Sequence, residues 1–276
     1  ASCHEQKNGF SDPRKKSIGT NGEETSFHSM PLTNIAWMDQ FFWDGRAPTR
    51  ESQALQPVNN PHELDMTWQE VAQRLKEHST YPAKFRAAFG EVEIDSNLVI
   101  DALVQFEMTL VSSNSRYDRW IRGELNLTDL EEDGYSIFLN FKQGDCIHCH
   151  KPDNVNFADN SFHNNGLDTQ EEQLPGLQYV TGRELDRGKF KTPSLRNLIF
   201  TAPYMHDGRF ETLEDVIEFY STGVNHYDGV DPKMEFSSQG GVHLDEYQTK
   251  AIIAFLKTLS DSSILTNLNF SDPFKN

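Results

Sequence analysis

The chain has 276 residues, a formal net charge of −17 at pH 7 and a mean hydropathy of −0.64. It contains no run of about 18 apolar residues, so the sequence predicts no membrane-spanning helix. The negative charge argues against a nucleic-acid partner, whose phosphates would be repelled, and favours a basic partner or simply good solubility. The length suffices for two ordinary domains, each with its own core.

The first segment, residues 5–36, is polar and carries Gly9, Gly19 and Gly22 without sustained periodicity. This pattern predicts a long loop wrapped over a cofactor. The stretch from Trp37 to Ala47 then combines aromatic side chains with a turn. We expect this stretch to be buried.

Two helices are predicted next. The residues Thr67-Trp68-Gln69-Glu70 form a capping box, which predicts an amphipathic helix as far as about His78. Residues 97–111 predict a strongly apolar helix that belongs to the core. The pattern breaks at residues 112–127, where we expect the boundary between a domain of residues 1–127 and a domain of residues 128–276. The last helix and tail of the second domain are expected to pack back on the first.

The second half is also predicted to be helical. Capping boxes at residues 128–131 and 212–215 predict one helix that runs into Cys146 and another that ends before Gly223. Residues 151–190 predict a loop, and residues 244–259 a final amphipathic helix. Strand signals are few and no 20–50-residue period repeats cleanly, so the fold class is mainly α with long loops.

The sequence Cys146-Ile147-His148-Cys149-His150 is a complete C-x-x-C-H, the attachment motif of a c-type haem. Two thiols at this spacing can each form a thioether to a haem vinyl group, and His150 is then placed to bind the iron. A surface disulfide and half of a zinc site are the alternatives. No second cysteine pair completes a zinc cluster, so haem is favoured.

The third cysteine is explained by the first four residues, Ala1-Ser2-Cys3-His4. They match the end of a second C-x-x-C-H whose first cysteine would precede residue 1; the alternative is a chance Cys-His pair. Covalent haem attachment at this motif is expected outside the cytoplasm. We therefore expect a periplasmic or otherwise extracytoplasmic chain from which a leader has been removed.

Eight motifs, in order along nearly the whole chain, resemble the bacterial dihaem cytochrome c peroxidases and their relative MauG. They are C-H at 3–4, F-W-D-G-R-A at 42–47, N-P-x-E at 60–63, S-R-Y-D-R-W at 115–120, C-x-x-C-H at 146–150, F-H-N-x-G at 162–166, K-T-P-S-L-R-N at 191–197 and T-A-P-Y-M-H-D-G at 201–208. The resemblance implies two mostly helical cytochrome-c-like domains with one covalently bound haem c each and the active site near their interface.

The resemblance also implies roles for single residues. His4 would bind the haem that reacts with hydrogen peroxide, and His150 the haem that stores or relays an electron. Trp43 falls where the family has a tryptophan between the haems, although a packed core aromatic is the alternative. Gln53 and Glu63 fall at positions beside bound peroxide, where Glu63 would act as general acid and base; on sequence alone Glu63 would be a solvated loop residue.

The sixth ligand of the relay haem differs within the family, being methionine in the peroxidases and tyrosine in MauG. Ungapped counting from Thr201 reaches Tyr220. A phenolate favours ferric and higher oxidation states, whereas a thioether stabilises ferrous iron. Met205 and Met234 are competing thioether ligands, and Tyr220 is alternatively a core aromatic on an amphipathic helix.

Two positions depart from the family pattern. Thr20 stands where many peroxidases have a histidine that blocks the peroxide-binding haem, so an open site is expected. His28 stands at an asparagine that binds calcium in the family, while Thr201 and Pro203 match its backbone-carbonyl calcium ligands. Since calcium takes oxygen ligands, His28 puts a calcium site in doubt.

Taken together, these features predict a dihaem oxidoreductase that uses hydrogen peroxide and oxidises an aromatic residue of a partner protein, as MauG does. One alternative is a peroxidase that reduces peroxide to water with electrons from a small cytochrome c or cupredoxin, which a strongly acidic surface would suit. A dihaem electron-transfer cytochrome without peroxide chemistry is the alternative outside the enzymes.

Overall fold

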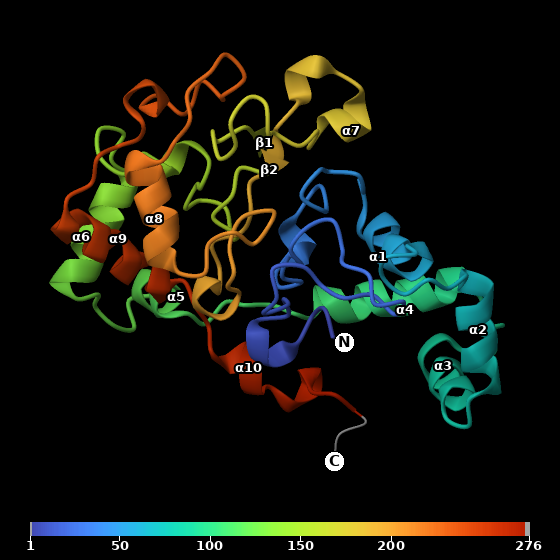
Figure 1. Cartoon of the computed structure of the whole chain (residues 1–276). Helices are drawn as coiled ribbons and strands as arrows, with labels where there is room; N and C mark the ends of the chain where they lie inside the picture. Colours follow the sequence, from blue (N-terminus) through green and yellow to red (C-terminus); the bar gives the residue numbers. More distant parts are fainter. Residues whose placement is uncertain (1, 274–276) are drawn as a thin grey trace.

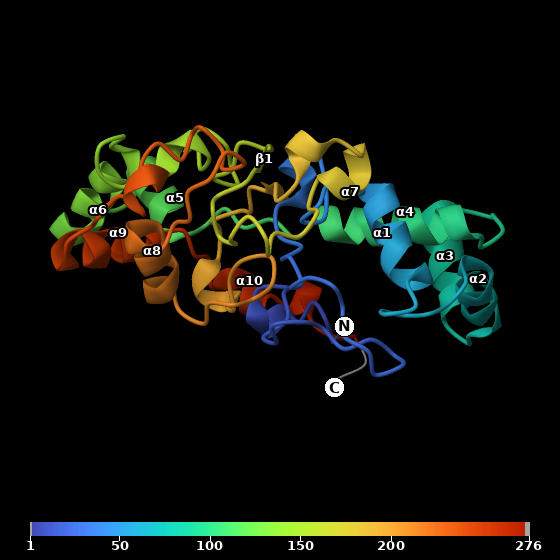
Figure 2. The same ribbon diagram turned by 45° about the horizontal axis from the view of Figure 1, so that its top comes forward.

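The computed structural model describes residues 2–273, which form a largely helical, elongated molecule (Figures 1 and 2). The helices are α1 (Arg50–Asn59), α2 (Trp68–Glu77), α3 (Tyr81–Phe89), α4 (Ser96–Met108), α5 (Arg116–Ile121), α6 (Asp129–Leu139), α7 (Gln178–Thr181), α8 (Leu213–Thr222), α9 (Glu246–Thr258) and α10 (Ser263–Thr266). The strands are β1 (Phe162–His163) and β2 (Phe190–Lys191). Among the described residues no helix has the length and apolar character needed to cross a membrane. The mainly α fold class is confirmed.

One hydrophobic core lies in the C-terminal half, where α6 and α9 pack against each other (Figure 1). Phe138, Phe157 and Phe255 are almost fully buried there. Gly134 makes the close approach possible, because a Cβ atom at this position would collide with the carbonyl oxygen of Ala251. Burial of three large aromatic rings contributes several kcal/mol at about 25 cal/mol per Å² of apolar area.

A second core lies at the other end of the molecule, between α1, α2, α3 and α4. Trp68, Phe85 and Val104 are buried in it. The Thr67 side chain caps α2 as predicted, because its hydroxyl accepts the Glu70 N–H and the Glu70 carboxylate accepts the Thr67 N–H. The helix over the predicted range 97–111 is only partly core, since its outer face exposes Leu103, Phe106 and Met108 and other side chains.

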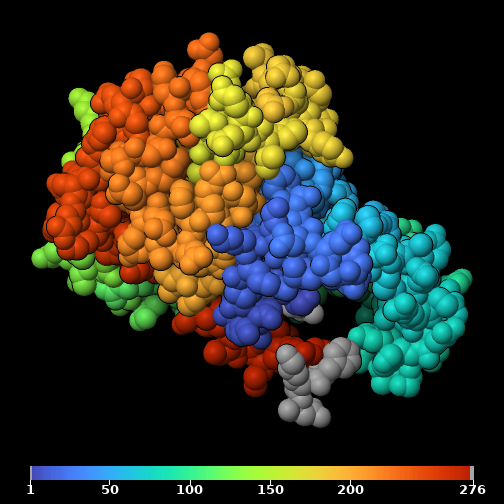
Figure 3. Space-filling model, in the orientation of Figure 1, coloured from blue at the N-terminus to red at the C-terminus, as the bar shows by residue number. Residues whose placement is uncertain are grey.

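Loops fill the space between the two cores, and the N-terminal segment lies there, between the C-terminal half and the side that carries α1 (Figures 1 and 3). The only sheet of the described residues is the antiparallel pair β1 and β2, in which Phe162 pairs with Lys191. The Lys191 N–H donates to the carbonyl of Trp43 at 2.8 Å, which ties this pair to the N-terminal half. This middle region holds the residues of interest.

Contacts between distant segments bear on the predicted domains. Gln6 donates to the carbonyls of Ile264 and Asn267, and the Phe270 ring meets the ring of Phe10. α5 lies before the predicted boundary, yet its Tyr117 packs in the C-terminal core. The boundary at residue 127 stays a prediction.

Two expectations are corrected. The helix that begins after Thr128 ends at Leu139 instead of running into the haem motif, because residues 140–145 form a turn in which Gly144 donates to the Ile137 carbonyl. The motif then begins on a 3-10 turn, Cys146–His148. Trp37, predicted to be buried, is 46% exposed, because the short turn that carries it buries Ile35 and points the indole outward.

Candidate active site

The C-x-x-C-H motif lines a cavity of about 150 Å³ in the C-terminal half. Asp145 enters the motif in the left-handed conformation (φ 55°), and the chain then turns so that Cys146, Cys149 and His150 all border the cavity. The His150 Nδ1 atom lies 2.8 Å from the Phe157 carbonyl oxygen. This bond makes Nδ1 the protonated nitrogen and leaves Nε2 free with a lone pair, as an iron ligand requires. Burial lowers the pKa of His150 to about 4, so the imidazole is neutral at pH 7.

Tyr220 reaches the same cavity from α8. Its hydroxyl oxygen accepts a hydrogen bond from Asn165 Nδ2 at 3.0 Å. Burial raises the pKa of Tyr220 to about 12, so the side chain is a neutral phenol until a cation displaces its proton. Met205 and Met234 border the cavity too, so the three candidate ligands lie around one space.

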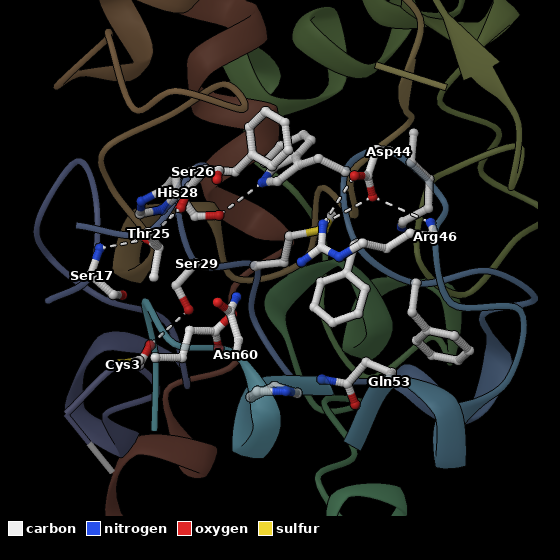
Figure 4. A pocket seen from close by; sticks show the side chains of 18 of the residues that line it. Cys3, Ser17, Thr25, Ser26, His28, Ser29, Asp44, Arg46, Gln53 and Asn60 are labelled. Carbon is white, nitrogen blue, oxygen red and sulfur yellow. Dashed lines mark hydrogen bonds and ion pairs between the residues drawn. The ribbon is translucent and has the colours of Figure 1, made fainter. Parts of the chain in front are cut away.

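A larger cavity of about 430 Å³ lies in the N-terminal half (Figure 4). Cys3 and His4 form part of its wall. The His4 Nδ1 atom lies 3.0 Å from the Phe10 carbonyl oxygen, which repeats the arrangement at His150, and burial again lowers the pKa of the imidazole. Each cavity therefore has a cysteine and a histidine whose Nδ1 is bound to a backbone carbonyl, and Ser29 Oγ lies 3.5 Å from the Nε2 of His4. This arrangement fits two haem groups, whose iron would take the Nε2 of each histidine.

Gln53 and Glu63 both line the N-terminal cavity, as the resemblance implied. Gln53 is buried on α1, and its Oε1 has no hydrogen-bond partner within residues 2–273, which suits a group facing a ligand. Glu63 follows α1 in a turn, where its Oε1 accepts from Asn60 Nδ2 at 2.8 Å. Asn60 also lines the cavity and holds one carboxylate oxygen while leaving the other available.

Thr20 is not part of the cavity wall. Its N–H and hydroxyl donate to the carbonyls of Glu63 and Leu64, so this loop covers the Glu63 turn from outside. A histidine that the sequence analysis missed does line the cavity: His62, whose Nδ1 lies 2.6 Å from a carboxylate oxygen of Glu23. No motif marked it, because it occupies the unspecified position of N-P-x-E.

Trp43 borders both cavities and is buried. Its Nε1 donates to the His28 carbonyl at 2.9 Å, and its ring lies edge-on to that of His206, with 6.5 Å between the ring centroids. The indole is thereby fixed in orientation. Its predicted role between two haem groups stays a prediction.

The residues expected around calcium make a poor oxygen cage. His28 is buried with its Nδ1 3.1 Å from the Arg14 carbonyl oxygen. The carbonyls of Lys15 and Thr201 also face the ring, although burial has the larger effect and lowers the pKa of His28. The Arg14 carbonyl oxygen therefore accepts an imidazole N–H in place of contacting an ion. A calcium ion bound by Thr201 and Pro203 stays a prediction from the resemblance. The imidazole of His28 beside the Thr201 carbonyl does not fit an oxygen-ligated ion well.

A charged group beside the C-terminal cavity was not anticipated. His163 lies between two carboxylates, with Nε2 2.8 Å from Asp159 Oδ2 and Nδ1 2.7 Å from Asp231 Oδ2. Lys233 binds Asp159 as well, at 2.9 Å. Cys149 lies within 4.8 Å of Asp159 and His163, but its sulfur belongs to the haem motif, so we assign no metal ion there.

The chain is similar to several known dihaem proteins. The family model for the dihaem cytochrome c peroxidases matches residues 1–126. The methylamine utilization protein MauG of Methylorubrum extorquens is 35% identical over 94% of this chain and 71% of its own length. The cytochrome c551 peroxidase of Nitrosomonas europaea is 32% identical over 94% of this chain and 73% of its own length. A crystal structure of a MauG-like protein associated with microbial copper homeostasis superposes with a TM-score of 0.91 at 31% identity, covering 99% of this chain and 87% of that one.

Proposed function

Because this chain belongs to the family of dihaem cytochrome c peroxidases and MauG proteins, which are hydrogen-peroxide-dependent oxidoreductases, we propose that it oxidises an aromatic residue in a partner protein, as the MauG branch does. His4 and His150 would hold the irons of two haem groups, which would supply the redox chemistry with peroxide when bound. Membership of this enzyme family leaves no support for a purely electron-carrying cytochrome.

The observation that carries the proposal is Tyr220 in the cavity of the C-x-x-C-H motif. A phenolate oxygen is a hard, anionic ligand, so it would favour oxidised iron and oppose storage of a reducing electron. Asn165 holds the oxygen in the cavity by donating to it. A relay site that resists reduction suits removal of electrons from a partner better than delivery of electrons from a donor.

The N-terminal cavity would receive hydrogen peroxide. Gln53 offers an unpaired amide oxygen to a bound hydroxyl, and Glu63 can accept the proton of peroxide and return it to the leaving oxygen. Thr20 supplies no blocking ligand, which supports a site that needs no prior reduction. Partner oxidation would proceed by electron transfer through Trp43, so the substrate need not enter either cavity.

The partner is a protein met outside the cytoplasm, where haem is attached to C-x-x-C-H. The net charge of −17 favours a basic docking face on it. The names of the relatives suggest two biological processes, methylamine utilisation and copper homeostasis. The second is named for the MauG-like protein whose crystal structure matches 99% of this chain. We take copper homeostasis as the setting to test first.

The rival function is peroxide reduction with electrons from a small cytochrome c or cupredoxin. It is favoured by Met205 and Met234, which border the same cavity as Tyr220 and could supply a thioether. The test is the resting ferric EPR and optical spectrum of the holoprotein with Tyr220→Phe and, as the matched control, Met205→Leu. We expect Tyr220→Phe to change the low-spin signal and Met205→Leu to leave it in place; the reverse would support the peroxidase.

A further inference from the structure

Lys191 occupies an unusual place at the junction of the two cavities. It lies on β2, its backbone is tied to Trp43, and its side chain borders both cavities. Only 3% of the residue is exposed. Lysine is almost never buried to this degree unless it has a charged partner.

No carboxylate of residues 2–273 forms an ion pair with Lys191. Two other lysines of the C-terminal half are matched differently: Lys189 pairs with Asp186 and Lys233 with Asp159. Burial without a counter-charge lowers the pKa of Lys191 to about 8, so the ammonium form still dominates at neutral pH. An unpaired buried cation destabilises the fold, which indicates an anion that belongs at this place and comes from outside the polypeptide.

His206 also borders the C-terminal cavity, and one of its ring nitrogens is unsatisfied. Its ring stacks on Phe190, with centroids 3.8 Å apart, so its orientation is fixed. Its Nε2 is buried without a hydrogen-bond partner in the part of the chain that is described, and the Asp168 Oδ2 atom is 4.0 Å away, too far for a hydrogen bond. Lys191 and His206 both border this cavity, next to Trp43.

A haem carries two carboxylates on one edge, and these are the anions that a haem cavity receives. We propose that Lys191, assisted by His206, binds a carboxylate of the haem in the C-terminal cavity. The ammonium supplies the charge and the histidine a directed hydrogen bond. Since both residues adjoin Trp43, the same contact fixes the carboxylate edge of the haem beside the indole.

This inference rests on haem in the C-terminal cavity, as in the proposed function, but not on peroxide chemistry or on Tyr220. Its failure is therefore distinguishable: a haem protein that lacks the proposed reaction with peroxide can still show the Lys191 effect, and an active enzyme can lack it.

The test is an EPR-monitored redox titration of the holoprotein between about pH 5 and about pH 8, in which the carboxyl group of a haem would titrate if left unpaired. We compare Lys191→Met with Lys191→Arg, which keeps the charge, and with Lys189→Met as a control two residues away. We expect Lys191→Met to lower the reduction potential of the C-terminal haem and to make it fall as the pH rises, because the unpaired carboxylate now takes up a proton on reduction.

Lys191→Arg should keep the potential and its weak pH dependence, which also shows that the position tolerates substitution. Resonance Raman spectra should show a shifted haem carboxylate bending mode in Lys191→Met alone. The proposal is overturned if Lys191→Met and Lys189→Met behave alike, or if the change is confined to the N-terminal haem.

Discussion

Glu63 is the residue on which proton transfer in the N-terminal cavity depends in our proposal. Its carboxylate is held by Asn60 in the cavity that Gln53 also lines with an unpaired oxygen. Glu63→Gln keeps the shape but cannot accept a proton, so the rate of reaction with peroxide should fall by about 100- to 10,000-fold. Stopped-flow absorption of the ferric protein mixed with peroxide measures this rate.

Glu51→Gln is the matched control, because Glu51 is an exposed glutamate at the start of the same helix, α1. It should react with peroxide at the wild-type rate. An undiminished rate in Glu63→Gln would remove the role that we assign to this carboxylate.

His163 makes stability depend on pH. Burial lowers its pKa, but the hydrogen bonds to the carboxylates of Asp159 and Asp231 outweigh burial and raise it above its usual value. A folded-state pKa above the unfolded value of about 6.5 means that the charged imidazole stabilises the fold fully below about pH 6.5 and that this contribution is lost as the pH rises from there through the raised folded-state pKa. Urea denaturation should therefore show a larger loss of unfolding free energy between these pH values in wild type than in His163→Asn; equal losses would contradict the assignment.

The predictability of the site varies from residue to residue. Cys146, Cys149 and His150 are marked by spacing alone, because covalent attachment requires that spacing. Lys191, His206 and Asn165 lie in the motif regions, yet their importance depends on what packs around them: a cavity wall, a missing counter-charge, a tyrosine 55 residues away. Local sequence does not encode such contacts between distant segments.

Helix starts were the most predictable elements. The boxes at Thr67, Thr128 and Thr212 all cap helices as expected, because the cap is a local hydrogen-bond pattern. α1 escaped prediction: its cap pairs Thr49 with Ser52 in place of an acidic residue, and Pro57 lies within the helix. The predicted end of α6 was wrong for a related reason. The turn after Leu139 is stabilised by backbone hydrogen bonds, which apolar periodicity does not reveal.

The cap of α8 bears on the proposed function because this helix carries Tyr220, the proposed haem ligand. The Thr212 hydroxyl accepts from the Asp215 N–H, and the Asp215 carboxylate accepts from the Thr212 N–H. Thr212→Ala should lower the unfolding free energy by about 1 kcal/mol. Thr222→Ala, at the exposed other end of α8, is the control and should change the unfolding free energy by only a few tenths of the effect of Thr212→Ala. Thermal denaturation of both variants distinguishes loss of the cap from a general effect of losing a threonine.

The whole molecule is organised around the contact of its two halves, and Trp43 lies at that contact. Its backbone carbonyl binds β2, its indole binds the His28 carbonyl, and its ring borders both cavities. The two helical cores could be anticipated from capping and periodicity, but their relative placement could not. That placement depends on residues outside the long helices, such as Lys191 and Gln6, whose partners lie far away in sequence.

Trp43→Phe should separate the two haem sites electronically. Phenylalanine fills most of the space but is much harder to oxidise than an indole, so electron transfer between the haems should slow by at least about tenfold. Freeze-quench EPR after peroxide addition should show an early change in the signal of the N-terminal haem and a delayed change in the signal of the C-terminal haem.

Trp68→Phe provides the control for this experiment. Trp68 is equally buried and donates to the Leu55 carbonyl at 3.0 Å, but it lies in the N-terminal core away from both cavities. The Trp68→Phe variant should be less stable than wild type, but electron transfer between its haems should not slow. Equal electron-transfer rates in Trp43→Phe and wild type would make Trp43 a packing residue only.

The most direct measurement of the central claim is the optical and EPR response of the all-ferric holoprotein to one equivalent of hydrogen peroxide. An open N-terminal site coupled through Trp43 to a tyrosinate-bound haem predicts reaction without prior reduction and a long-lived oxidised product with spectral changes at both haems. If nothing happens until one haem is reduced, the enzyme is a conventional electron-fed peroxidase and MauG-like oxidation of a partner protein is contradicted.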